Sequence, residues 1–176
     1  GAGVTLNLAD SAGAAAFDTV VTRENSYLEL SLAAAEAVLA KQDDYQGLNR
    51  IIADTTERFT STDNLDVLIG SAEELEVVDE ASVEQLQTIV SAFDGELSAI
   101  DYRLSDSLEN LTDPANSALV QGVNEEGYRV TDEPEELGSL NANHALVLLG
   151  AANFSETAFG EVVVADTAAA LQDLFQ

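Results

Sequence analysis

The longest regular pattern of apolar positions lies near the middle of the chain, where apolar residues recur at steps of three and four. This spacing puts side chains on one face of a helix and is typical of a heptad seam. The seam consists of Val83, Leu86, Val90, Phe93, Leu97, Ile100 and Leu104. Ser82 and Gln85 have the spacing of a capping box at its start. We therefore expect a long central helix over about 80–111.

Shorter stretches with helical spacing surround the seam. Ser26 and Glu29 form a second capping-box pair, and Asp113-Pro114 has the order of an N-cap followed by proline at the first helical position. Asp63 can cap a helix that carries Leu65 to Leu75. The predicted shorter helices cover residues 11–22, 26–41, about 44–60, 65–75 and 114–121.

The last third of the chain has a mixed pattern. Strands are predicted there at 128–131 and 161–165, and a further strand is predicted near the start of the chain at 4–9. In these stretches apolar and polar residues alternate or β-branched residues cluster. The apolar run in 141–150 fits a helix or a buried strand. Asp166 can cap a final helix whose inward residues are Leu171, Leu174 and Phe175.

These elements predict a mainly α fold. We expect a helical bundle built around the long helix at about 80–111, with a small mixed α/β part at the C-terminal end. A single domain over 1–176 would contain a helical part at about 11–122 and a mixed part at about 123–176. No convincing internal repeat and no linker between domains is evident in the pattern.

The charge changes this picture most. Asp and Glu number 33 against 6 Lys and Arg, which gives a net charge of −27. Such a charge opposes compaction in dilute salt, and molar salt screens it to a Debye length of about 3 Å. We therefore expect a protein from a salt-rich source that loses helix in low salt. The alternatives are an extracellular protein that binds divalent cations and an anionic protein that binds a basic partner.

The same charge argues against nucleic acid and anionic lipid as partners, because such binding uses Lys and Arg to neutralise phosphates. No stretch of 18 apolar residues occurs, so no transmembrane helix is expected. A chain that starts at Gly1 is expected to have lost either an initiator Met or a leader.

Catalytic chemistry has little support in the sequence. His144 is the only histidine, there is no Cys, and no serine lies in a G-x-S-x-G elbow. Glycine-rich phosphate loops are absent as well. We expect no catalytic residue, no cofactor and no enzymatic activity.

Two acidic clusters are the candidates for metal binding, although neither has the spacing of an EF-hand loop. Their residues are Asp63, Asn64 and Asp66 in the first cluster, and Asp132, Glu133, Glu135 and Glu136 in the second. We expect at most weak binding of divalent or monovalent cations.

Two N-x-S/T sequons, at Asn110 and Asn153, are candidate glycosylation sites if the protein is exported. The heptad seam could pack within one chain or between subunits. A seam of this length packs more often within one chain, and both alternatives stay open.

The functional prediction is a structural or assembly protein of a halophile without enzymatic activity. It would be a virion component, an extracellular filament or a surface-layer accessory, and a homo-oligomer held by apolar helix faces. Its expected location is extracellular or in a virion, with the cytoplasm of a halophile as the alternative. A secreted acidic helical module that binds a metal ion or a small solute is the second hypothesis.

Overall fold

The computed structural model describes residues 4–8, 26–42, 49–160 and 162–174. Strands and short helices alternate along the chain, which divides into two compact units. The first unit takes residues 1–80 and 84–102, and the second takes 81–83 and 103–176. Strands β1 to β6 are hydrogen-bonded to one another in chain order.

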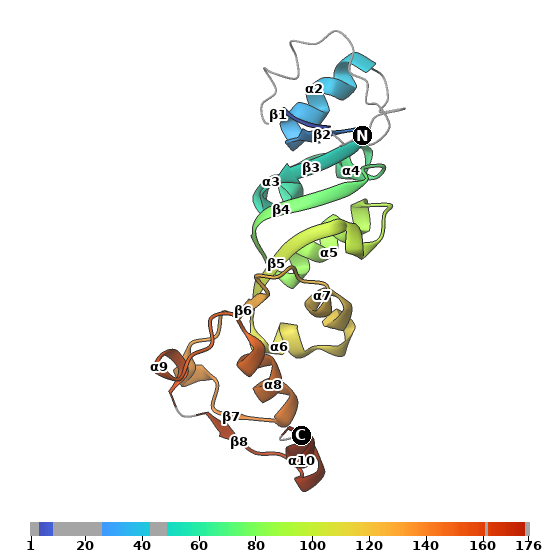
Figure 1. The fold of residues 1–176 in the computed structure, drawn as a ribbon. Helices are drawn as coiled ribbons and strands as arrows, with labels where there is room; N and C mark the ends of the chain where they lie inside the picture. Colours follow the sequence, from blue (N-terminus) through green and yellow to red (C-terminus); the bar gives the residue numbers. More distant parts are fainter. Residues whose placement is uncertain (1–3, 9–25, 43–48, 161, 175–176) are drawn as a thin grey trace. The chain divides into compact units, whose positions relative to one another are not determined.

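The strands of the first unit lie side by side and run parallel (Figure 1). Val4 lies opposite Ser26, Leu28 opposite Arg50, and Ile51 opposite Glu74. Parallel pairing requires each connection to cross back over the sheet, and helices lie in the connections that the structure describes, from β2 to β3 and from β3 to β4. The strands are β1 (Val4–Leu8), β2 (Ser26–Leu30), β3 (Arg50–Asp54) and β4 (Glu74–Ala81).

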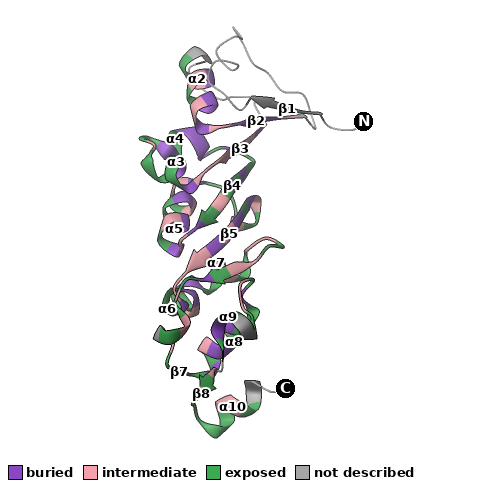
Figure 2. Ribbon diagram, turned by 90° about the vertical axis from the view of Figure 1, so that its left-hand side faces the viewer, coloured by how far each residue is buried: buried purple, intermediate pink, exposed green. Residues whose placement is uncertain are grey.

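Helices cover one face of these strands, as Figure 2 shows. Alternate strand residues face the helices and are buried, whereas their neighbours on the other face, such as Glu74 and Glu76, are exposed. The helices are α2 (Leu32–Gln42), α3 (Thr56–Ser61), α4 (Leu65–Ile69) and α5 (Val83–Ala92). The buried apolar residues of these strands are Leu28, Leu30, Ile52, Leu75, Val77 and Ala81.

The second unit contains shorter strands. β5 (Ile100–Asp106) pairs in parallel with β6 (Tyr128–Val130) through its last residues. β7 (Ser139–Leu140) and β8 (Val163–Val164) form a separate parallel pair. The α-helices of this part are α6 (Leu108–Thr112), α7 (Ser117–Gln121), α8 (Ala142–Gly150), α9 (Glu156–Phe159) and α10 (Ala168–Leu174). The 3₁₀ turns are η1 (Leu97–Ala99), η2 (Pro114–Asn116) and η3 (Pro134–Glu136).

The prediction of a helical bundle is wrong, because the fold is mixed α/β with a parallel sheet of strands. The expected helix at 80–111 divides into α5, η1, β5 and α6. Its second half has a strand period instead, since Ile100, Tyr102 and Leu104 are buried at every second position. The three-and-four spacing of the seam passed through Ile100 and Leu104 and missed Tyr102 between them.

The same substitution of strand for helix occurs at three other predicted helices. Residues 26–30 of the helix predicted at 26–41 form β2, and residues 50–54 of the helix predicted at 44–60 form β3. The predicted helix at 65–75 ends at Ile69, and β4 begins at Glu74. In the first two cases a short strand is followed by a helix, and in the third the helix comes first and the strand follows.

Several shorter predictions are confirmed. Strands occupy Val4–Leu8, Tyr128–Val130 and Val163–Val164, and α8 decides the undecided stretch at 141–150 in favour of a helix. The predicted helix at 114–121 is present as η2 and α7, and the final helix as α10. The helix predicted at 11–22, the side chain of Leu174 and Phe175 lie outside the described residues.

The described strands reveal a repeat that the sequence pattern did not. Residues that lie opposite each other on neighbouring strands are 22 residues apart at Val4 and Ser26 and 24 apart at Ser139 and Val163. A repeat is therefore one strand with the helical segment that follows it. Stacked repeats of this size bury a core that no single repeat could build.

Candidate functional site

The most regular chemical feature of the described residues is a series of aspartates at or near strand ends, which we call the carboxylate ladder: Asp54, Asp79, Asp106, Asp132 and Asp166. Each carboxylate accepts a backbone N–H from the start of the helix in the preceding repeat, at nitrogen–oxygen distances of 2.5 to 3.0 Å. The donors, in the same order, are Leu32, Thr56, Val83, Leu108 and Ala142. Donor and acceptor are 22 to 24 residues apart, so each bond (a rung) ties one repeat to the next.

The position of the rungs follows from helix chemistry. The first N–H groups of a helix have no partner within the helix, and the helix dipole makes that end favourable for negative charge. An ionised carboxylate satisfies both demands with a charge-assisted hydrogen bond. Aspartate has a short side chain, so its carboxylate stays close to the strand end that carries it.

A serine or threonine after the aspartate completes the local structure in three repeats. The hydroxyls of Thr55, Ser107 and Thr167 each accept an N–H from three residues further on, as N-cap residues do. The backbone N–H groups of Thr55, Ser107 and Thr167 themselves donate to the aspartate just before each of them, at 2.6 to 2.9 Å. The Asp-Ser or Asp-Thr pair thus begins its own helix and holds the helix of the repeat before it.

Two repeats vary this arrangement. Asp79 accepts both the N–H and the hydroxyl of Thr56. The helical turn η3 begins with Pro134, which has no N–H to donate to an aspartate. The next strand, β7, is followed by Asn141, where other repeats have an aspartate. Asn141 instead caps α8 by accepting the N–H of His144 at 2.8 Å.

The sequence carries a signal for the ladder that the helical reading overlooked. An apolar residue, a small residue, aspartate and a hydroxyl residue follow one another four times: 8–11, 52–55, 104–107 and 164–167. The first of these tetrapeptides extends outside the described residues. Repeats with a changed motif separate the four matches, so no fixed period is visible without the strand register.

The predicted metal ligands do not form a coordination group. Asp63, Asn64 and Asp66 are exposed, and Asn64 has the left-handed φ of 55° that a turn requires. Asp132 is engaged as a rung of the ladder. Glu133 and Glu135 are exposed, and the side chain of Glu136 is not described. Within the residues that the structure describes, no group of three or more His, Asp or Glu side chains could hold a metal ion.

The two sequon asparagines have different surroundings. The side chain of Asn153 donates to the carbonyl of Val130 at 2.8 Å and accepts its N–H at 3.0 Å. Its amide therefore pairs with β6 as a strand residue would. Asn110 is exposed on α6, and its amide nitrogen donates to Asp106 at 2.8 Å.

Most residues of the predicted heptad seam are buried within the chain. Val83, Leu86 and Phe93 are buried on α5, and Ile100 and Leu104 are buried on β5. The remaining two, Val90 and Leu97, are half-buried.

Arg50 is a buried cation that the sequence did not single out. Its side chain has no exposed surface, and its guanidinium donates to the carbonyl of Leu68 at 3.0 Å and to the hydroxyl of Ser71 at 2.8 Å. The backbone N–H of Arg50 donates to Glu73. Arg50 thus ties the first residue of β3 to the end of α4 and the loop that follows it.

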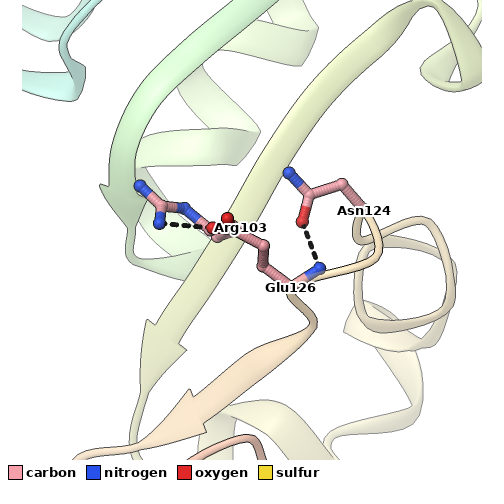
Figure 3. Close-up of polar contacts among 3 residues, drawn as sticks. All are labelled: Arg103, Asn124 and Glu126. Atoms are coloured by element: carbon pink, nitrogen blue, oxygen red, sulfur yellow. Dashed lines mark hydrogen bonds and ion pairs between the residues drawn. The ribbon is translucent and has the colours of Figure 1, made fainter.

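On the second unit, Arg103 of β5 forms an ion pair with Glu126 at 2.5 Å (Figure 3). Asn124 accepts the N–H of Glu126 at 3.0 Å, which holds the loop that carries the glutamate. The glutamate side chain is 65% exposed, so solvent screens this pair and its contribution to stability is small.

Burial and hydrogen bonding alter the acidity of three groups. Burial raises the pKa of Tyr102 to about 12 and also raises the pKa of Tyr128, whose hydroxyl donates to the carbonyl of Val147 at 2.9 Å. The N–H groups of Ala142 and Thr167 lower the pKa of Asp166 below its ordinary value by stabilising the carboxylate. No strongly perturbed acid and base lie together in this set.

No helix within the described part of the chain is long and apolar enough to cross a membrane. No family model matches the chain, and no curated protein or solved structure matches it either.

Proposed function

We propose that the chain is a structural module without enzymatic activity, whose stacked repeats form a scaffold for contacts with other protein chains. The carboxylate ladder is the observation that carries the proposal. Its aspartates are groups that could otherwise bind a metal ion or act as an acid and a base. They accept backbone N–H groups and join neighbouring repeats instead.

A scaffold of this kind needs no ligand to reach its fold, and this separates it from a cation-binding module. A bound ligand stabilises a folded protein in proportion to its concentration relative to Kd. We expect the same melting temperature in chelator, in calcium and in magnesium when ionic strength is matched. A saturable rise with either divalent ion would overturn the scaffold proposal and favour a binding module.

Contacts with other copies of the chain are the second part of the proposal. Leu146 and Leu149 lie three residues apart on α8 and are 51% and 55% exposed. Exposed apolar side chains on one helix face favour association. Sedimentation velocity over a range of protein concentrations tests this, and we expect the sedimentation coefficient to rise with concentration.

The double variant Leu146→Glu/Leu149→Glu should remain monomeric at concentrations where the parent associates. Asn143→Glu is the control, because Asn143 is exposed on the same helix and gains one of the two negative charges that the double variant gains without losing an apolar side chain. A parent chain that stays monomeric at every concentration would remove the assembly part of the proposal and leave the scaffold part to the melting experiment.

A further inference from the structure

The carboxylate ladder uses one chemical form of aspartate. An ionised carboxylate only accepts hydrogen bonds, whereas a protonated one carries an O–H that must donate. Asp106 accepts three donors, the N–H groups of Val83 and Ser107 and the amide of Asn110, at 2.7 to 2.8 Å. Both carboxylate oxygens of Asp106 therefore face N–H donors, and a proton added to either oxygen would meet another donor.

We propose that the carboxylate ladder is an acid-sensitive lock, in which protonation of its aspartates releases each repeat from the next. Protonation of a rung aspartate places a donor where the carboxylate accepts an N–H, so it weakens the bond between the two repeats. In a stacked-repeat protein, cooperativity depends on the interfaces between neighbouring repeats. Loss of the rungs therefore uncouples the repeats before their own helices and strands melt.

Asp166 shows the expected direction at the last rung. Its pKa is lowered by the N–H groups of Ala142 and Thr167. A carboxylate whose pKa is lowered by folding contributes stability above its unfolded value, and this contribution is lost as the pH falls through the folded value. Acid therefore opens this rung. At the other four rungs the carboxylate also accepts a backbone N–H from the start of a helix in the preceding repeat.

The surroundings of the rungs are mainly acidic. The charged residues on the elements that meet at Asp79 are Arg50 and Asp54 of β3, Glu57 and Arg58 of α3, and Glu74, Glu76 and Glu80 of β4. Those on the elements that meet at Asp106 are Glu84 of α5, Asp101 and Arg103 of β5, Glu109 of α6, Arg129 of β6 and Asp132 beyond it. Acid also relieves repulsion among these carboxylates, which opposes unlocking. The two effects are separable, because only a rung loses hydrogen bonds when it is neutralised.

Asparagine in place of aspartate imitates the neutral form, and hydrogen exchange of single amides reads the state of one rung. In Asp79→Asn and Asp106→Asn at pH 7, the amides of Thr56 and Val83 should exchange about ten to a hundred times faster, as expected for the loss of a charged hydrogen bond. Urea unfolding from pH 7 to pH 3 should show a smaller fall in midpoint for each variant than for the parent. Glu84→Gln and Glu109→Gln are the controls, since both remove an exposed charge on a neighbouring helix.

If either variant fails to fold, Asp166→Asn supplies the same test at an exposed rung, read at the amide of Ala142. Unchanged exchange at the donor amides would overturn the lock. So would a pH dependence as steep in the rung variants as in the parent and the two glutamine controls. Both readouts are independent of association and of cation binding, so they separate this proposal from the proposed function.

Discussion

Asn153 uses both ends of its side-chain amide to bind the backbone of β6. It satisfies both the N–H and the carbonyl of Val130, a residue that is buried. Asn153→Ala leaves both groups unpaired, so we expect the free energy of unfolding to fall by about 2–4 kcal/mol. Urea denaturation at pH 7 measures this loss.

Two further variants make that measurement specific. Asn143→Ala, at an exposed site on α8, should change stability by less than about 0.5 kcal/mol. Asn153→Asp places a carboxylate against the carbonyl of Val130 and should recover part of its stability when protonated. Equal stability of Asn153→Ala and Asn143→Ala would contradict the pairing with β6.

Tyr102 predicts how the protein responds to alkali. Burial raises its pKa to about 12, so between the ordinary value of 10 and 12 the unfolded chain releases a proton that the folded chain keeps. The contribution to stability is complete below pH 10 and is lost as the pH rises through this window. Urea midpoints should fall over that range, and Tyr102→Phe should make the fall shallower. A slope that is unchanged in the phenylalanine variant would refute this assignment.

Residue chemistry was only partly predictable from the sequence. His144 donates its backbone N–H to Asn141 at the start of α8. Asp132, which the sequence predicts as a possible metal ligand, forms a rung of the ladder instead. A chain with 33 acidic residues offers too many acidic pairs for pairing alone to identify a site. The distinguishing partner of each ladder aspartate is a backbone N–H, and the tetrapeptide motif accompanies only three of the five rungs, at Asp54, Asp106 and Asp166.

Helix starts govern stability at the scale of the elements. Ser107 accepts the N–H of Asn110 at 3.3 Å and begins α6, a helix of 5 residues. Such a short helix depends on its cap and its packing. Ser107→Ala should lower the free energy of unfolding by about 1 kcal/mol, measured by urea denaturation. Ser107→Thr keeps the hydroxyl and should retain most of the stability, whereas equal losses in the two variants would argue against a capping role.

The element predictions failed where a buried strand runs straight into a helix. Leu28 and Leu30 of β2 precede Leu32 of α2, and all three are buried. Over so few residues, alternation at every second position and helical spacing at every fourth position select overlapping sets of residues. The parallel pairing that decides between them joins residues 22 to 24 positions apart and is invisible in a local window.

Charge acts on the whole molecule. The net charge of −27 repels itself in the folded state more strongly than in the expanded unfolded chain. Sodium chloride should therefore raise the urea midpoint between about 0.05 M and 1 M, over which the Debye length falls from above 10 Å to about 3 Å. Choline chloride should act similarly if screening is the cause, and an effect confined to sodium would indicate specific binding instead.

The constancy of the ladder spacing has a consequence for how the chain can vary. Every rung needs one N–H from the repeat before it and one carboxylate from the repeat after it. The described helices between donor and acceptor differ from rung to rung: α2 lies between Leu32 and Asp54, whereas α3 and α4 lie between Thr56 and Asp79. A whole repeat could therefore be duplicated or deleted, and the newly joined neighbours would meet the same pair of groups. Pro134 marks the place in the described chain where such an exchange would fail, because it offers no N–H to an incoming aspartate.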